Sequence, residues 1–334
     1  IKSNTDTTIE TIYKFIEKSM FHDELLKEKE LVKKEKEEQD KIILQKEKSI
    51  DYLKTPKVIC MEYIEKEKSI KTIQQKKRKA IEKELQKRKE EYPDILKDVE
   101  KWKELDNTHY QLQQTENKLT ILEGYINEQI KKLCNLLQEE GFIKFEDDKY
   151  ISCTTNGTIS SHIAEVHGPI WIQCMVDKWN YFEDFSAKQL VGLFSCVTDV
   201  KLGEDYETHT IKTEDVFLKG KITEMKSVYD KFEREEEKRD IRTGIKYEEA
   251  FSCSIIDETM KWCDCQTEEE CKQFISQELI AKGISLGDFT KAIMKIATIS
   301  KEFRSLYELE CCQTHTEWLH KLTRIEELVL KYIA

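Results

Sequence analysis

Glycine and proline are scarce in this sequence, and glycine is missing from its N-terminal third. The 334 residues include ten glycines and three prolines, and the first glycine is Gly124. Tight hairpin turns and bulges favour glycine, so they are not expected before that point. We therefore predict a helical N-terminal third and a mainly helical chain. The hydrophobic fraction of 39% is typical of helices that expose charged faces.

Long apolar runs are also absent. None approaches the roughly 20 residues that a membrane-spanning helix requires, so no membrane contact is expected. The eleven cysteines form no compact repeating pattern, and no signal peptide is recognisable. They are expected to be reduced thiols in an intracellular compartment, either cytoplasmic or nuclear. The first residue, Ile1, is not methionine, which indicates a piece of a longer polypeptide.

Motifs for nucleotide chemistry are missing too. The Gly220-Lys221 region lacks the upstream glycine and the following Ser or Thr of a phosphate-binding loop. No G-x-G-x-x-G or G-x-S-x-G stretch occurs, so we expect no catalytic residue and no cofactor site in this chain. Free thiols are favoured over a metal site at two groups that lack the paired C-x-x-C spacing of zinc sites. These groups are Cys263, Cys265 and Cys271, and Cys311 and Cys312 with His315.

Long helices are predicted before residue 141. An apolar stripe from Ile9 to Ile16 predicts one helix over 7–29. Thr55-Pro56 and residues 91–94 predict breaks, with helices over 57–90 and 95–140. The last of these has apolar residues at the spacing of a helix packed along a partner: Leu112, Leu119, Leu122, Ile126, Ile130, Leu133 and Leu137. A long antiparallel hairpin joined near 91–110 is predicted, and a coiled-coil dimerisation arm is the alternative.

The composition changes from residue 141, where glycine, aromatic residues and cysteine return. Asn156-Gly157 is a strong turn pair, so a small β element is predicted around it, followed by a helix from about Ser160. Ser186 is expected to cap a helix that has Gln189 at its third position. Residues 141–334 are thus predicted to form a helical bundle, with further helices over 213–237, 245–264, 267–280, 283–303 and 314–333.

Several residues in this half admit a chemical or a structural role. His162 and His167 flank Glu165 and can be acid–base machinery, but a structural role on a helix is favoured. Four tryptophans are favoured as core anchors over a base-stacking platform: Trp171, Trp179, Trp262 and Trp318.

Residues 71–89 form a basic run, with nine Lys or Arg and two Glu, although the chain carries a net charge of −11. Such a helix can lie along a phosphate backbone or bind an acidic protein partner. Alternatively, its charges pair with glutamates on an opposing helix, and the sequence does not decide between these readings. The candidate patch consists of Lys76, Lys77, Arg78, Lys79, Lys87 and Arg88.

The stretch "GISLGDFTKAIMKIATISKEF", residues 283–303, is the second candidate surface. Ile293 and Ile296 share the apolar face of a predicted helix with Ala297 and Ser300. Lys291 and Lys295 lie on an adjacent face, and Asp288 is the expected N-cap. By itself, the pattern favours ordinary solvent-facing lysines over contacts to an anion.

Six segments in order, from about residue 125 to the end, resemble the C-terminal helical (DSHCT) domain of Ski-two-like superfamily-two RNA helicases. They are "LLQEEGFIKF", "YISCTTNGTISSHIAEVH", "FEDFSAKQLVGLFSCVTDV", "ETMKWCDCQTEEECKQFI", "GDFTKAIMKIATISKEF" and "LHKLTRIEELVLKYI". The resemblance implies a module that follows two RecA-like motor domains and a winged helix in the same polypeptide. ATP and Mg²⁺ would serve the intact helicase.

In that family one DSHCT helix faces single-stranded RNA and acts as a ratchet. The resemblance places Lys291 and Lys295 at its basic positions, and Thr298 where the family has an acidic residue. Lys301 and Arg304 are outer candidates. Lysine in place of the usual arginine keeps the attraction to phosphate but loses the planar, bidentate fork.

The same resemblance divides the chain into three parts. Residues 1–28 match the end of the winged-helix region, 29–140 the stalk of the family's arch, and 141–334 the DSHCT bundle. The missing glycines leave no room for the KOW domain that the arch carries, so functions of that domain are not expected. The bare stalk resembles shorter relatives, including some encoded by large DNA viruses or protists. A non-enzymatic helical scaffold with a protein partner on the 29–140 arm is the alternative function.

Overall fold

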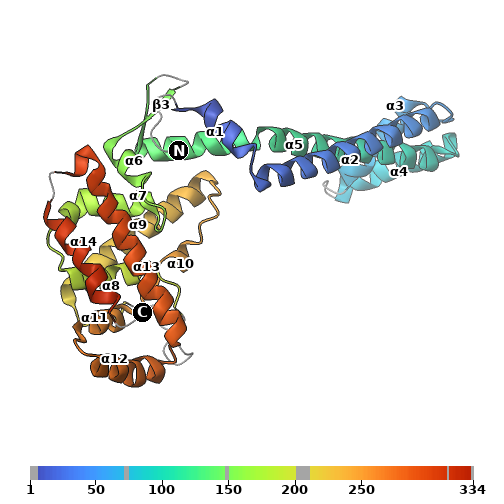
Figure 1. Ribbon diagram of the computed structural model, residues 1–334. Helices are drawn as coiled ribbons and strands as arrows, with labels where there is room; N and C mark the ends of the chain where they lie inside the picture. The colour runs from blue at the N-terminus through green and yellow to red at the C-terminus, as the bar shows by residue number, and fades with distance from the viewer. Residues whose placement is uncertain (1–6, 71–74, 147–149, 201–210, 314–315, 332–334) are drawn as a thin grey trace. The chain divides into compact units, whose positions relative to one another are not determined.

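The computed structural model describes residues 7–70, 75–146, 150–200, 211–313 and 316–331 (Figure 1). It divides into two compact units. We call Tyr13–Glu128 the stalk unit, and Ile1–Ile12 with Gln129–Ala334 the bundle unit. The predicted fold class is confirmed, because the described part is mainly helical, with one long hairpin, one bundle and one small sheet.

Two long helices, α2 (Met20–Ile50) and α5 (Ile95–Glu139), run antiparallel in the stalk unit (Figure 1). Contacts between the two helices show this direction, because the residue numbers of successive partners rise along α2 and fall along α5. Glu28 meets Lys118 at 3.2 Å, Lys36 meets Glu116 at 2.8 Å, and Lys46 donates to Thr108 at 2.9 Å. Between them lies a buried apolar seam of Leu25, Val32, Ile43, Leu105 and Leu122. The predicted hairpin is confirmed, and the seam that a dimerisation arm would use is filled within the chain.

The connection between the two long helices was predicted near residues 91–110, and this position is wrong, because α5 is continuous from Ile95 onward. A second helical pair, α3 (Lys57–Ile70) and α4 (Gln75–Glu91), follows α2 and precedes α5 in the chain, and Figure 1 shows it at the end of the hairpin. The expected single helix over 57–90 is therefore two helices. Both predicted breaks are confirmed, because α2 ends before Pro56 and α5 begins after Pro93. A small core closes the pair, formed by Cys60, Tyr63, Ile64, Leu85, Ile95 and Val99.

The predicted single helix over 7–29 is wrong. Helix α1 (Ile9–Ile16) stops, and α2 begins at Met20. Ser19 explains the break, because its hydroxyl accepts from the His22 N–H at 3.3 Å and donates to the Ile16 carbonyl at 2.6 Å. This residue is an N-cap, which ends one helix and starts the next.

The bundle unit opens with a three-stranded antiparallel sheet in the order β1-β3-β2. Its strands are β1 (Thr7–Thr8), β2 (Ile143–Phe145) and β3 (Tyr150–Cys153). The predicted β element is present, but Asn156-Gly157 is not its turn, since it lies inside helix α6 (Thr155–Ser160). Gly157 is there for a close approach: a Cβ at this position would lie 1.9 Å from the Phe142 carbonyl oxygen.

Helix α8 (Ala187–Ser195) lies at the centre of the bundle and packs against α11 (Ile256–Asp264), α13 (Leu286–Ser305) and α14 (Thr316–Val329). The predicted cap is confirmed, because Ser186 and Gln189 form a reciprocal capping box. The helix expected over 245–264 is two helices, α10 (Tyr247–Ala250) and α11. The remaining α-helices are α7 (Gly168–Ile172), α9 (Val216–Arg239) and α12 (Glu268–Phe274).

Aromatic rings fill the bundle core. Phe303 of α13 contacts the rings of Trp171, Phe182 and Phe194, with centroid distances of 5.5 to 5.8 Å. The tryptophans singled out in the sequence are core residues, and all four are nearly or fully buried. Their indole N–H groups have polar partners in three cases: Trp171 donates to Tyr229, Trp179 to Glu224, and Trp262 to the Val329 carbonyl.

We expect Phe303→Ala to lower the free energy of unfolding of the bundle by about 3–5 kcal/mol, because it leaves a cavity between the rings of Trp171, Phe182 and Phe194. Urea unfolding followed by tryptophan fluorescence measures this, since four of the five tryptophans are in the bundle unit. Met294→Ala on the same helix is the control, because Met294 is 51% exposed and its loss should change stability by less than about 0.5 kcal/mol. Equal effects of the two changes would contradict this account of the core.

Candidate nucleic-acid interface

The N-terminus of α13 differs from prediction by one turn. Ser285, not Asp288, is the N-cap, and its hydroxyl accepts from the Asp288 N–H at 3.0 Å. The same hydroxyl donates to the Asp288 carboxylate at 2.8 Å. This hydrogen bond lowers the pKa of Asp288, and the nearby Lys291 lowers it further. Asp288 therefore acts in the first turn, where a negative charge is stabilised by the helix dipole.

The inner face of α13 is buried in the bundle, as the sequence predicted. Ile293 and Ile296 are fully buried, and Ala297 is 2% exposed. Ser300, also on this face, donates to the Leu322 carbonyl of α14 at 2.8 Å. Helices α13 and α14 lie side by side (Figure 1). The position of α13 is therefore set by packing along its length.

The outer face carries three of the five predicted site residues in one stripe. Lys291, Thr298 and Lys301 are exposed along a line of three- and four-residue steps. Met294 completes this stripe and was not singled out from the sequence, because a methionine in an amphipathic helix is usually a core residue. Lys295 lies beside the stripe and is half-buried. We call Lys291, Met294, Lys295, Thr298 and Lys301 the α13 edge.

Neighbouring carboxylates neutralise part of this edge. Lys291 pairs with Asp288 at 3.2 Å across one helical turn. Lys301 and Arg304 share one partner, Glu326 of α14, at 3.4 and 3.5 Å. Lys295 makes no ion pair with any residue in the described part of the chain. Of the predicted cations, Lys295 is thus the least neutralised, and Lys301 and Arg304 are brought together at a carboxylate.

A surface cavity of about 420 Å³ adjoins the start of the edge. It is lined by Thr198, Asp199, Val200, Asp288, Lys291, Ala292 and Lys295. Two carboxylates and two ammonium groups nearly cancel there, so the cavity by itself does not select an anion. The cavity instead offers room beside the two lysines for a neutral group of a bound molecule.

The basic run of the stalk unit is divided between paired and free cations. Arg78 pairs with Glu82 at 2.9 Å within α4. Arg88 pairs with Glu62 of α3 at 3.3 Å, which is the pairing with a glutamate of an opposing helix that the sequence offered as an alternative. Lys79 is exposed on the same helix, and Lys87 makes one long contact of 3.9 Å to Glu91. The side chains of Lys76 and Lys77 lie outside the described part of the structure.

The histidines and cysteines have structural surroundings. Nδ1 of His162 lies 2.8 Å from the Thr158 carbonyl oxygen, and the Glu165 N–H donates to Glu302 at 2.9 Å. His167 is the N-cap of α7 and lies against the rings of Tyr229, Phe232 and Tyr247. These positions favour the structural reading of all three residues.

All eleven cysteines are free thiols. Within the described residues, no cluster of three or more His, Cys, Asp or Glu side chains is arranged to hold a metal ion. His315, which belonged to one candidate group, lies outside the described part. No helix among the described residues is long and apolar enough to cross a membrane.

Burial of His167 predicts a pH-dependent stability. Desolvation lowers the pKa of His167 from 6.5 to about 4 in the folded protein. Between these values the unfolded chain binds a proton that the folded chain does not, so stability falls as the pH is lowered from about 6.5 to 4. The loss is at most about 3 kcal/mol.

Urea midpoints between pH 7 and 4 measure this loss in the wild type and in His167→Asn. Asparagine also caps helices, so the variant should keep α7 and lose this part of the pH dependence. An unchanged pH dependence in the variant would show that other groups cause it.

Comparisons with known proteins do not add a family. No protein-family model matches the chain, and no curated protein sequence matches it.

Proposed function

We propose that the bundle unit is an RNA-contacting module of an ATP-dependent RNA helicase of the Ski-two-like type. The α13 edge lies along single-stranded RNA and holds it through contacts to the phosphate backbone. ATP hydrolysis, with its Mg²⁺, belongs to motor domains elsewhere in the same polypeptide, because this sequence has no phosphate-binding motif. The free thiols support placing the protein in a reducing compartment of the cell, cytoplasmic or nuclear.

One observation carries the proposal: α13 is anchored on one face and open on the other. Apart from Met294, its apolar residues are buried from Phe289 to Phe303, so the helix has little freedom to shift. On its open face, Lys291 and Lys301 lie ten residues apart, or about 15 Å along the axis. A rigid, straight row of cations suits an extended strand, where charge repeats regularly along the backbone.

The chemistry of the edge predicts weak and sequence-independent contact. Lysine ammonium groups bind phosphate as point charges and do not read base edges. Met294 and Thr298 lie between the cations and offer a small, nearly neutral surface against which bases can pass. Such a surface holds a strand without fixing its register, which is what a ratchet in a moving channel requires.

We expect Lys291→Ala/Lys295→Ala to weaken binding of a fluorescent single-stranded oligouridylate, measured by anisotropy on the full chain. The slope of log K against log salt should fall by about 1.4, or 0.7 for each lost phosphate contact. Lys219→Ala/Lys226→Ala is the matched control, because both lysines are exposed on α9 and make no ion pair among the described residues. Unchanged affinity and slope in the first variant would contradict the assignment and favour the scaffold alternative.

A change of opposite sign tests the same surface. Glu326→Gln removes the carboxylate that Lys301 and Arg304 share, so both cations become available to RNA. We expect binding to tighten by up to about five-fold, the equivalent of one weak surface ion pair. Weaker or equal binding by Glu326→Gln, with the fold retained by circular dichroism, would exclude Lys301 and Arg304 from the interface.

A further inference from the structure

The distal helical pair of the stalk unit concentrates positive charge in an acidic chain. Residues 57–91, which span α3 and α4, contain twelve Lys or Arg and seven Glu, whereas the whole chain has a net charge of −11. Figure 1 shows the two helices at the end of the α2–α5 hairpin. Charge density alone does not make a binding surface, so the positions of the glutamates decide which cations are free.

Most of those glutamates are already engaged, and among the described residues only Glu91 also reaches an outward lysine, Lys87, at 3.9 Å. Glu84 accepts from Lys66 of α3, which lowers the pKa of Glu84. Glu62 and Glu91 both pair with Arg88. Two further pairs are Arg78 with Glu82 and Lys103 with Glu67. Five of the seven glutamates therefore pair with cations that lie at the sides of α4 or on neighbouring helices.

The outward face of α4 keeps two lysines without an ion pair to any described residue and a third with one long contact. Leu85 is buried and Ile81 half-buried, and these residues mark the inner face. The helical period places Lys79, Lys83 and Lys87 on the opposite side, and all three are exposed. Lys79 and Lys83 make no ion pair with the described residues, and the Lys87 side chain is 75% exposed with one 3.9 Å contact to Glu91. Residues 71–77, just before this face, contain no Asp or Glu that could neutralise it.

Lys83 was not part of the patch singled out from the sequence. It lies between two glutamates in the chain, Glu82 and Glu84, and looks neutralised there. The structure turns both glutamates to other partners, Arg78 and Lys66. Lys83 thereby joins Lys79 and Lys87 in a row with steps of four residues, or about 6 Å. We call these three residues the α4 row.

We propose that the α4 row is a second nucleic-acid contact, which binds the phosphate backbone without reading sequence. The alternative partner, an acidic protein segment, is less well matched. Protein interfaces are usually anchored by aromatic or large apolar side chains at their centre. The described outward face of α4 offers no apolar side chain larger than Ala80, and it is otherwise Lys, Gln and Glu. Evenly spaced point charges without an apolar anchor suit a phosphate backbone.

This inference does not depend on the α13 edge, because the two surfaces belong to different units of the chain. The test uses the full chain with Lys79→Gln/Lys83→Gln/Lys87→Gln and a fluorescent 20-mer oligouridylate. A duplex RNA of equal length is the second probe, and it tells whether the row prefers one strand or two. Each measurement is repeated in a Lys291→Ala/Lys295→Ala background, where the α13 edge no longer contributes.

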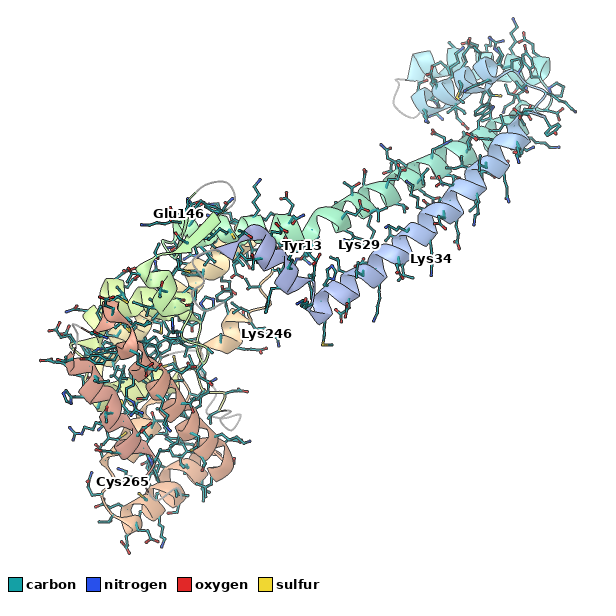
Figure 2. All side chains as sticks on the ribbon, turned by 45° about the horizontal axis from the view of Figure 1, so that its top comes forward. Tyr13, Lys29, Lys34, Glu146, Lys246 and Cys265 are labelled. Atoms are coloured by element: carbon teal, nitrogen blue, oxygen red, sulfur yellow. The ribbon has the colours of Figure 1, made fainter. Side chains whose placement is uncertain are left out.

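A matched control removes the same charge elsewhere in the stalk unit. Lys33, Lys34 and Lys41 are exposed on α2 and make no ion pair among the described residues. Figure 2 shows Lys34 on the side of α2 turned away from α5. Lys33→Gln/Lys34→Gln/Lys41→Gln therefore changes the net charge by the same amount without touching α4.

We expect the α4 triple variant to bind one or both probes about ten-fold more weakly at 50 mM salt. Its slope of log K against log salt should fall by about 2, while the control variant stays within two-fold of wild type. Equal losses in the two triple variants would reduce the effect to net charge and overturn the proposal. No loss in the α4 variant, or tighter binding of the full chain to poly-glutamate than to RNA, would also overturn it.

Discussion

The candidate RNA surface depends on the burial of one face of α13. Phe303 stacks on Phe194, and Trp171 and Phe182 close around the pair, so the C-terminal half of α13 is held by rings from three other segments. The N-terminal half is held by the Ser285 cap and by Phe289, which contacts the rings of Trp262 and Phe274. Because both ends are fixed, the side chains of the open face start from a rigid backbone. A row of lysines on a frayed helix would lose contact energy to ordering.

The second constraint is the competition for cations between acidic residues and any bound anion. Glu326 of α14 pairs with Lys301 and Arg304 of α13, whereas Lys295 has no such partner among the described residues. On α4 the same competition leaves Lys83 unpaired within the described part of the chain, because the neighbouring Glu82 and Glu84 pair with Arg78 and Lys66 instead. Net charge therefore says little about where this chain attracts an anion. What matters is which ammonium groups remain after the local pairs are formed.

Local signals made part of the fold predictable. The capping box at Ser186 and Gln189 and the breaks at Pro56 and Pro93 follow from residues within a few positions of each other. Asn156-Gly157 misled, because the glycine serves a contact with Phe142 that is distant in sequence. The α13 cap was misplaced because Ser285 and Asp288 are both good caps, and the sequence alone does not tell which of them accepts the first backbone N–H. The α3–α4 return was missed because a hairpin of two long helices satisfies the same apolar spacing.

The candidate site shows the same division. Periodicity was enough to put Lys291 and Thr298 on the open face, since the buried stripe of α13 is strong. Periodicity could not show that Lys301 and Arg304 meet Glu326, because that residue belongs to another helix. Nor could it show that Met294 is exposed, since an apolar residue of an amphipathic helix is expected to be buried. Ion pairs between helices join residues far apart in the sequence, and they decide how strongly a surface of lysines attracts an anion.

Both surfaces use lysine where a sequence-specific reader would use arginine. A lysine ammonium is a compact, strongly hydrated charge on a flexible stem, and it tolerates many phosphate positions. The α13 edge has one arginine nearby, Arg304, and Glu326 occupies it. A strand on these surfaces would therefore be held by summed point charges and could move past them at little cost. That property fits a channel through which a polymer must pass better than it fits a site that must recognise one sequence.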